Sequence, residues 1–233
     1  MTARPTPPRT TGRTGTRSTA AGPTAARALA ATLREQVLDG RLDPGAPLRE
    51  EALAVAHGVS RHTVRTALAT LAAERLVTTE EYRGARVARL TDADVRSLQD
   101  LRAALECEAV RIVGERHPGR WPAALVVPVT DALAALAATD TADWPAVERA
   151  HAAVHLAVVA AAGSPRLTEA YASLGAEVAL LLLHARAQYD LPALVAEHTA
   201  YLADVQERGP VAVRAHLTHL ADLLHPPARR PSA

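Results

Sequence analysis

The chain has 233 residues, with 26 basic and 25 acidic side chains and a formal net charge of +1. This balance excludes a bulk polycation, so any contact with nucleic acid must come from local clustering of charge. A single cysteine, Cys107, excludes an internal disulfide framework and favours a reducing compartment. The sequence has no apolar run of membrane length and no hydrophobic signal core at its N-terminus, so we expect a cytoplasmic protein without membrane contact.

The two ends of the chain are expected to lie outside any folded core. Residues 1–24 are rich in Thr, Pro, Gly and Arg, which predicts a disordered basic tail, and residues 227–233 predict a frayed tail. Between these ends we expect two domains, over residues 25–90 and 91–226.

Residues 48–77 read LREEALAVAHGVSRHTVRTALATLAAERLV, two helical hydrophobic patterns separated by one tight turn. Leu53 and Ala56 give the first helix an inward face, and Gly58 supplies the backbone freedom of the turn. Ser60 is placed to cap the second helix, which buries positions at helical spacing: Val64, Leu68 and Leu71. This pattern is typical of a helix-turn-helix. An ordinary helical hairpin with a solvated basic face would give the same sequence pattern.

The free face of the second helix carries side chains suited to a DNA groove. Its amino end presents residue types that reach phosphates and base edges: Ser60, Arg61, His62, Thr63 and Arg65. An amphipathic segment over 28–38 precedes the motif, and two short strands are predicted over 76–79 and 85–88, with Arg83-Gly84 in their turn. Three helices and a hairpin predict a winged helix-turn-helix.

The whole run from Leu33 to the YRGARVA segment resembles the GntR family of bacterial transcription regulators. The resemblance implies that Arg49, Arg61 and Arg65 hold phosphates or bases, with Ser60 and His62 beside them and Gly84 at a wing tip in the minor groove. It also implies a homodimer on a palindromic operator. The chain departs from the family pattern twice: His62-Thr63 replaces Thr-Pro, which changes the expected base preference, and Arg75 replaces a glycine, which alters how the helix ends.

The remainder, from Asp92 to His225, is helical throughout and lacks strand signals. The expected segments are separated by short breaks at glycine, proline and aspartate: 92–105, 124–137, 146–162, 166–188, 192–205 and 211–224. We therefore predict a mainly α protein, with an antiparallel bundle of six or seven helices behind the winged helix. Such a bundle can enclose a ligand or metal.

Histidines are concentrated in this bundle. His151 and His155 lie four residues apart on one helix face, where two imidazoles can converge on a metal. His184, His198, His216 and His219 follow on later helices. A single such histidine is more often a hydrogen-bonded core or surface residue, but several on separate helices favour a site.

The segment VHLAVVAAAGSPRL resembles the FCD type of effector domain that follows GntR winged helices. The resemblance implies a site of one Asp and three His, in which His155, His198 and His219 are the histidines, with His216 as the competing assignment for the last. His151 stands at the Asp position. Four neutral imidazoles leave the charge of a divalent ion uncompensated, so we expect zinc or nickel and an anionic effector, or else loss of the metal.

Arg102 matches a family arginine near the ligand. This makes it a candidate carboxylate clamp for a small organic-acid effector. The alternative is a structural ion pair with Glu106, one turn further along the same helix.

Taken together, the sequence predicts a ligand-responsive repressor that binds double-stranded operator DNA and is not an enzyme. Two alternatives stay open. A metal-dependent hydrolase would use His151 and His155, but Ala152 stands where the metalloprotease pattern needs Glu. A helical dimerisation scaffold would keep the fold without function in the DNA-binding half.

Overall fold

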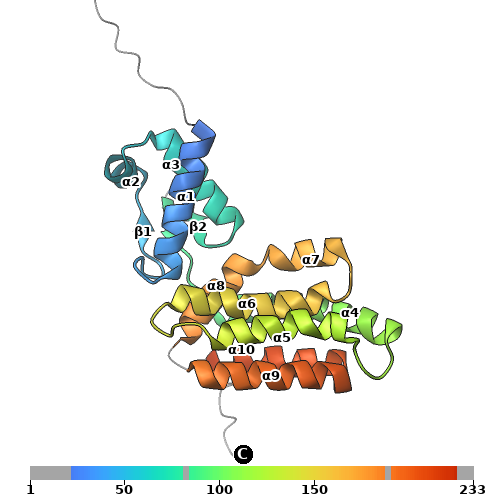
Figure 1. Ribbon diagram of the computed structural model, residues 1–233. Helices are drawn as coiled ribbons and strands as arrows, with labels where there is room; N and C mark the ends of the chain where they lie inside the picture. The colour runs from blue at the N-terminus through green and yellow to red at the C-terminus, as the bar shows by residue number, and fades with distance from the viewer. Residues whose placement is uncertain (1–21, 81–83, 187–189, 225–233) are drawn as a thin grey trace, which may run out of the picture.

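A computed structural model describes residues 22–80, 84–186 and 190–224, and Figure 1 shows an N-terminal winged helix above a bundle of helices. The expected tails fall largely outside the described residues. The mainly α architecture with a winged helix-turn-helix confirms the predicted fold class. No helix of the described part is long and apolar enough to cross a membrane.

The N-terminal domain packs three helices, α1 (Gly22–Leu38), α2 (Glu50–His57) and α3 (Arg61–Ala73), beside a small antiparallel sheet. The sheet has the order β1-β3-β2, formed by β1 (Pro47–Leu48), β2 (Val77–Glu80) and β3 (Gly84–Val87). The hairpin of β2 and β3 pairs Val77 with Val87 and Glu80 with Gly84. The predicted strands thus form, whereas β1 was not predicted because two residues carry no periodicity.

The turn of the helix-turn-helix follows from its residues. Gly58 adopts a left-handed conformation with φ 62°, which ends α2. Ser60 accepts a hydrogen bond from the Thr63 amide and caps α3, as expected. Val64, Leu68 and Leu71 are buried in the domain core, again as expected.

One expectation for α2 is wrong. Ala56 is exposed, whereas Ala54 packs with Leu53 against the core of the domain. The helix is only 8 residues long and none of them is fully buried, so its apolar pattern does not fix its rotation closely. The core contact is completed by Val59 beyond the turn.

Arg75, which stands where the resemblance implied a glycine, takes a conformation that favours glycine. Its φ is 57°, and no other non-glycine residue in the described part of the chain has a positive φ. A side chain in this region costs about 1 kcal/mol because Cβ approaches the carbonyl oxygen. The chain therefore turns from α3 into β2 at an energetic cost.

Seven helices form the described bundle, within the expected six or seven. In chain order they are α4 (Asp92–Arg116), α5 (Ala123–Ala137), α6 (Trp144–Ala160), α7 (Pro165–Ala172), α8 (Gly175–Ala185), α9 (Leu191–Arg208) and α10 (Pro210–Leu224). The single helix expected over 166–188 is therefore wrong within the described residues. The break after α7 lets α7 pack on α4 and α6, while α8 packs on α6 and α1.

Helix starts in the bundle are set by capping side chains. Thr91 and Asp94 form a reciprocal capping box at α4. Asp143 and Asp190 cap α6 and α9, and each stands ahead of a proline in the first turn. These local signals explain why the helix starts were readable in the sequence.

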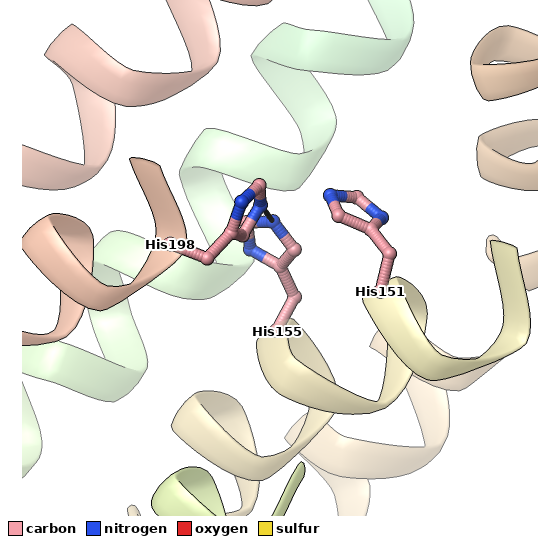
Figure 2. Close-up of side chains that lie close together, drawn as sticks. All are labelled: His151, His155 and His198. Carbon is pink, nitrogen blue, oxygen red and sulfur yellow. Dashed lines mark hydrogen bonds between the residues drawn. The ribbon is translucent and has the colours of Figure 1, made fainter. Parts of the chain in front are cut away.

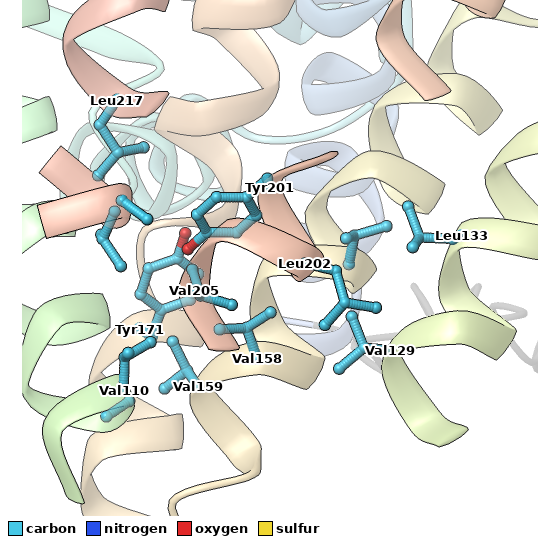
Figure 3. Close-up of a cluster of buried hydrophobic side chains, with 14 of the residues drawn as sticks. Val110, Val129, Leu133, Val158, Val159, Tyr171, Tyr201, Leu202, Val205 and Leu217 are labelled. Carbon is cyan, nitrogen blue, oxygen red and sulfur yellow. The ribbon is translucent and has the colours of Figure 1, made fainter. Parts of the chain in front are cut away.

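The bundle core is built mainly from valine and leucine of α4, α5, α6, α9 and α10. Figure 3 shows Tyr171 and Tyr201 among these side chains, close to Val110, Val159 and Val205. Burial of this apolar layer supplies the main stabilisation of the bundle and surrounds the polar residues described below with a dry environment.

The two domains meet at α8. Leu180 is 1% exposed and belongs to the hydrophobic cluster of the winged helix, although α8 is part of the bundle. Arg75 lies 3.7 Å from Glu177 of α8, between their side-chain Nε and Oε1 atoms. Figure 1 places α8 and α7 on the side of the bundle that faces α1, and α9 on the opposite side.

Candidate functional site

Three histidines converge in the bundle core. His151 and His155 project from α6 and His198 from α9, and each is 1% exposed (Figure 2). Each offers one ring nitrogen, and these nitrogens lie within 4.8 Å of one another. The i, i+4 spacing on α6 brings the first two rings to a centroid distance of 4.9 Å.

The fourth histidine of this group is His216, the assignment that the sequence left as the competitor. Its ring lies 5.2 Å from that of His155 and 4.7 Å from that of His198, between centroids. His219, three residues further along α10, is exposed to solvent, so the preference for His219 is corrected. Leu217, which follows His216, is buried and fixes the inward face of the helix. We call His151, His155, His198 and His216 the histidine cluster.

Hydrogen bonds orient two of these rings. His198 Nδ1 donates to the carbonyl oxygen of Leu194 at 2.7 Å, and His155 Nδ1 bonds to Glu106 Oε2 at 2.8 Å. With Nδ1 protonated on both rings, the two Nε2 atoms carry lone pairs, yet they face each other at 3.1 Å. Two lone pairs that face each other at this distance repel, and a cation that binds both nitrogens removes the repulsion. The two Nε2 atoms therefore fit a divalent metal as ligands.

Charge in the cluster agrees with this fit. Burial lowers the pKa of His198 to about 4 and lowers the pKa of His151, His155 and His216 well below the usual value for histidine. The imidazoles are therefore neutral at neutral pH, the form in which histidine binds metal. Nδ1 of His151 is buried without a hydrogen-bond partner, which leaves a nitrogen available to a ligand.

Glu106 of α4 is the centre of a second set of contacts. It is fully buried and accepts hydrogen bonds from Tyr171 and, at 2.8 Å, from Tyr201. Together with its contact to His155, these bonds tie α4, α6, α7 and α9 to one carboxylate. From the sequence, Glu106 was expected only as a partner for Arg102, and neither tyrosine was predicted, because these contacts join helices far apart in the chain.

Both interpretations of Arg102 have support. Its guanidinium lies 3.5 Å from Glu106 Oε1 and donates to Tyr171 and Gln99, which makes it a structural ion pair. Its Nη2 has no hydrogen-bond partner although the side chain is fully buried. The same side chain lines a cavity of about 850 Å³ that also reaches His155. A buried cationic donor at a cavity wall can bind an anion.

His184 stays outside the cluster. It is half-buried on α8 and its Nδ1 bonds to the carbonyl oxygen of Leu180. This is the common structural role of a helical histidine.

The predicted DNA-contacting residues lie at the start of α3 and the start of α2. Arg61, His62 and Arg65 are exposed on one face of α3, and Arg49 is exposed at the start of α2. Ser60 is exposed beside them, but Thr63 is buried and bonded to the Ser60 hydroxyl, so its expected place on the free face is wrong. Its role in the described structure is in the cap of α3.

Two acidic residues of α2 hold the arginines of α3. Arg61 pairs with Glu51 at 2.6 Å and Arg65 with Glu50 at 2.7 Å. Both arginines remain more than half exposed, and exposed pairs of this kind contribute little stability. The arginines can therefore exchange these partners for phosphates or bases at low cost.

The wing is only partly described. Gly84 begins β3 with φ 76°, a conformation that favours glycine, while the neighbouring residues 81–83 lie outside the described part. The placement of Gly84 in a minor groove stays a prediction.

Comparison with known proteins covers both domains. The profile described as bacterial regulatory proteins, gntR family, matches residues 25–87, and the FCD domain profile matches residues 97–222. The chain is 31% identical over 185 residues to a protein of Paenarthrobacter nicotinovorans named "Probable D-xylose utilization operon transcriptional repressor", covering 79% of this chain and 80% of that one.

Two further comparisons give partial and structural likeness. An uncharacterized HTH-type transcriptional regulator BphR of Paraburkholderia xenovorans is 40% identical over 94 residues, which span 40% of this chain and only 38% of that protein. A crystal structure of a GntR transcriptional regulator from Rhodococcus sp. RHA1 shares 28% identity and a TM-score of 0.65, covering 84% of this chain and 94% of that one.

Proposed function

The chain belongs to the gntR family of bacterial regulatory proteins and carries an FCD domain, and from this premise we propose that it represses transcription in response to a small anionic effector. Members of the family are DNA-binding transcriptional regulators and not enzymes, so the hydrolase alternative is not supported. Repression is supported by the likeness to the Paenarthrobacter relative, which is named as a probable transcriptional repressor.

The observation that carries the DNA-binding role is the exposed basic face of α3. Arg61, His62 and Arg65 share this face, and their acidic partners lie at the surface. A recognition helix in the major groove uses such side chains for base edges, while Arg49 and backbone amides hold phosphates. His62 stands where the family usually has threonine, and its exposed ring can hydrogen-bond to a base edge, so we expect a base contact there.

We propose that the protein acts as a homodimer. A single winged helix covers too few base pairs for useful specificity, and two related by a two-fold axis read a palindromic operator. In this proposal residues 25–90 bind DNA, residues 91–226 bind the effector and form the dimer, and the protein works in the cytoplasm.

We propose that His151, His155, His198 and His216 hold one divalent metal, zinc or nickel. FCD domains bind metal in some members of the family, and the facing Nε2 atoms of His155 and His198 support this for the present chain. When bound, the metal would supply positive charge that attracts an anionic ligand. Arg102 adds a fixed cation beside it, which favours a carboxylate.

The DNA-binding role is tested by selecting operator fragments with the purified full chain from a random duplex library, followed by gel-shift titration at fixed salt. Arg61→Ala and Arg65→Ala should each weaken binding by about 1–3 kcal/mol without loss of helical content. Arg27→Ala is the matched control, since Arg27 is an exposed arginine that lies on α1 and not on α3. Equal affinity of wild type and both α3 variants would refute the assignment.

The metal role has its own test. Elemental analysis should find about one zinc or nickel per wild-type chain, and this metal should be lost in His155→Ala and in His216→Ala. His219→Ala is the control, because His219 lies one turn from His216 but is exposed. Retention of metal by both cluster variants, or a wild type free of metal after incubation with zinc, would contradict the metal proposal and leave the DNA-binding proposal intact.

A further inference from the structure

The cavity beside the histidine cluster is lined by both domains. From the bundle it takes one face of α6 and residues of α7 and α8. From the winged helix it takes the carboxyl-terminal end of α1, including Arg34 and Leu38, and Glu74 after α3. At about 850 Å³ it falls within the volume range of ligand sites for drug-sized molecules.

The two sides of the cavity, the bundle end and the winged-helix end, both carry charged residues but differ in burial. At the bundle end, Arg102, Glu148 and His155 are nearly fully buried. Nη2 of Arg102 lies 3.5 Å from Glu106 Oε1 but makes no hydrogen bond, and Oε1 of Glu148 makes none either. Such orphaned buried atoms are uncommon and point to a ligand that completes their hydrogen bonds. At the winged-helix end, Arg34 is only partly buried and already pairs with Glu74.

The cavity also has apolar lining residues from both domains. Leu38 of α1, Leu156 of α6 and Val178 of α8 face the cavity, together with alanines of α6 and α8. Alanine side chains leave space that larger residues would fill. An apolar ligand body can therefore lie along these walls, with a polar group at the bundle end.

Helix α8 contacts both this cavity and the core of the winged helix. Val178 lines the cavity, while Leu180 is buried in the hydrophobic cluster of the winged helix. Ala176 both lines the cavity and packs against that cluster. A ligand that presses on α8 and on the end of α1 thus touches the two elements that join the domains.

We propose that the cavity is an effector site shared by the two domains, which takes a carboxylate with an apolar body: the carboxylate binds Arg102, and the body reaches Leu38 of the winged helix. This inference rests on the proposed effector function. Because the ligand contacts α1 as well as the bundle, its binding sets the position of the DNA-binding domain directly, without a relay through the bundle core.

The experiment uses octanoate as the probe and 1-octanol as its uncharged control, titrated calorimetrically into the full chain. Arg102→Met removes the proposed carboxylate anchor, and Leu38→Asp places a negative charge on the winged-helix wall. Ala28→Asp is the matched control, since it adds the same charge at an exposed position of α1 outside the cavity. Hydrogen exchange of residues 34–38 is measured with and without octanoate.

We expect octanoate to bind more tightly than octanol, to lose about tenfold or more in affinity in Arg102→Met and Leu38→Asp, and to bind Ala28→Asp within about twofold of wild type. Exchange at the end of α1 should slow with octanoate. If Leu38→Asp does not fold, Leu38→Ala should still weaken binding about fivefold through lost apolar contact.

Two results would contradict parts of the proposal. If the Leu38 variants bind octanoate as tightly as wild type while Arg102→Met loses affinity, the shared site is overturned but the effector function stands. Failure of wild type to bind octanoate, or unchanged binding in Arg102→Met, overturns the carboxylate assignment; the gel-shift test of Arg61 and Arg65 is independent of both.

Discussion

Glu148 offers a test of the electrostatics of the cavity through protein stability. Its side chain projects from α6, is 2% exposed and has an oxygen without a hydrogen-bond partner. Burial disfavours the charged carboxylate and raises the pKa of Glu148 from 4.5 to about 8, although the indole N–H of Trp144 and the positive charges of Arg149 and Arg186 act in the opposite direction. We predict that Glu148→Gln stabilises the protein at neutral pH and not in mild acid.

The sign and size follow from linkage. Below pH 4.5 the group is protonated in both states and has no differential effect. As the pH rises toward 8, the unfolded chain ionises while the folded chain keeps its proton, so the wild type loses stability across this window. One pKa unit corresponds to about 1.36 kcal/mol, which gives at most about 3 kcal/mol at pH 7. Water that enters the cavity lowers this cost, so we expect the variant to gain about 1–3 kcal/mol there.

Tryptophan fluorescence makes the assay specific for the bundle, because both tryptophans of the chain, Trp121 and Trp144, lie in it. Urea unfolding of wild type and Glu148→Gln is measured from pH 5 to pH 8 with a chelator present throughout. Glu169→Gln serves as the control, since Glu169 is an exposed glutamate on α7. The gain in unfolding free energy should be small at pH 5 and grow with pH. A difference that stays constant across the range would refute the reasoning.

Three further predictions concern other parts of the molecule. Arg75→Gly should raise the unfolding free energy by about 1 kcal/mol, measured by circular dichroism, because it relieves the positive φ and loses only an exposed ion pair; a loss of stability would mean that the contact with Glu177 outweighs the strain. Light scattering at micromolar concentration should give the mass of a dimer, and footprinting a short palindrome; a monomer with an asymmetric footprint would contradict the dimer. His151→Asp should keep the bound metal but weaken octanoate, since a carboxylate ligand cancels part of the positive charge of the site; stronger octanoate binding would reverse our account of that charge.

Most of the fold could be predicted from local signals in the sequence. Ser60 and Gly58 define the turn before α3, and Thr91, Asp143 and Asp190 define the starts of later helices. These residues act within three or four positions of themselves, so their effect is visible in one dimension. The break between α7 and α8 was missed because it depends on how these two helices pack on separate partners.

The candidate site was predictable in part for a related reason. His151 and His155 share a helix face, so their spacing alone indicates that they meet. The choice between His216 and His219 depends on the rotation of α10, which is fixed by packing of the neighbouring Leu217 and is not encoded in the spacing of the histidines. Contacts of Glu106 with Tyr171 and Tyr201 join residues 65 and 95 positions apart, which no local pattern reveals.

The charges around the cluster link its two proposed ligands. Arg102 and Glu106 form a buried pair that is neutral overall, and the four imidazoles are neutral as well. A divalent ion in the cluster would therefore leave its charge in a dry interior, where uncompensated charge is costly. A carboxylate in the adjoining cavity offsets that charge, so each ligand should strengthen the binding of the other by the same factor. With His151 in place of the aspartate that the family resemblance implies, the effector carboxylate would add to the negative charge of Glu106, which bonds to His155, and of Glu197, which lies 3.3 Å from His216.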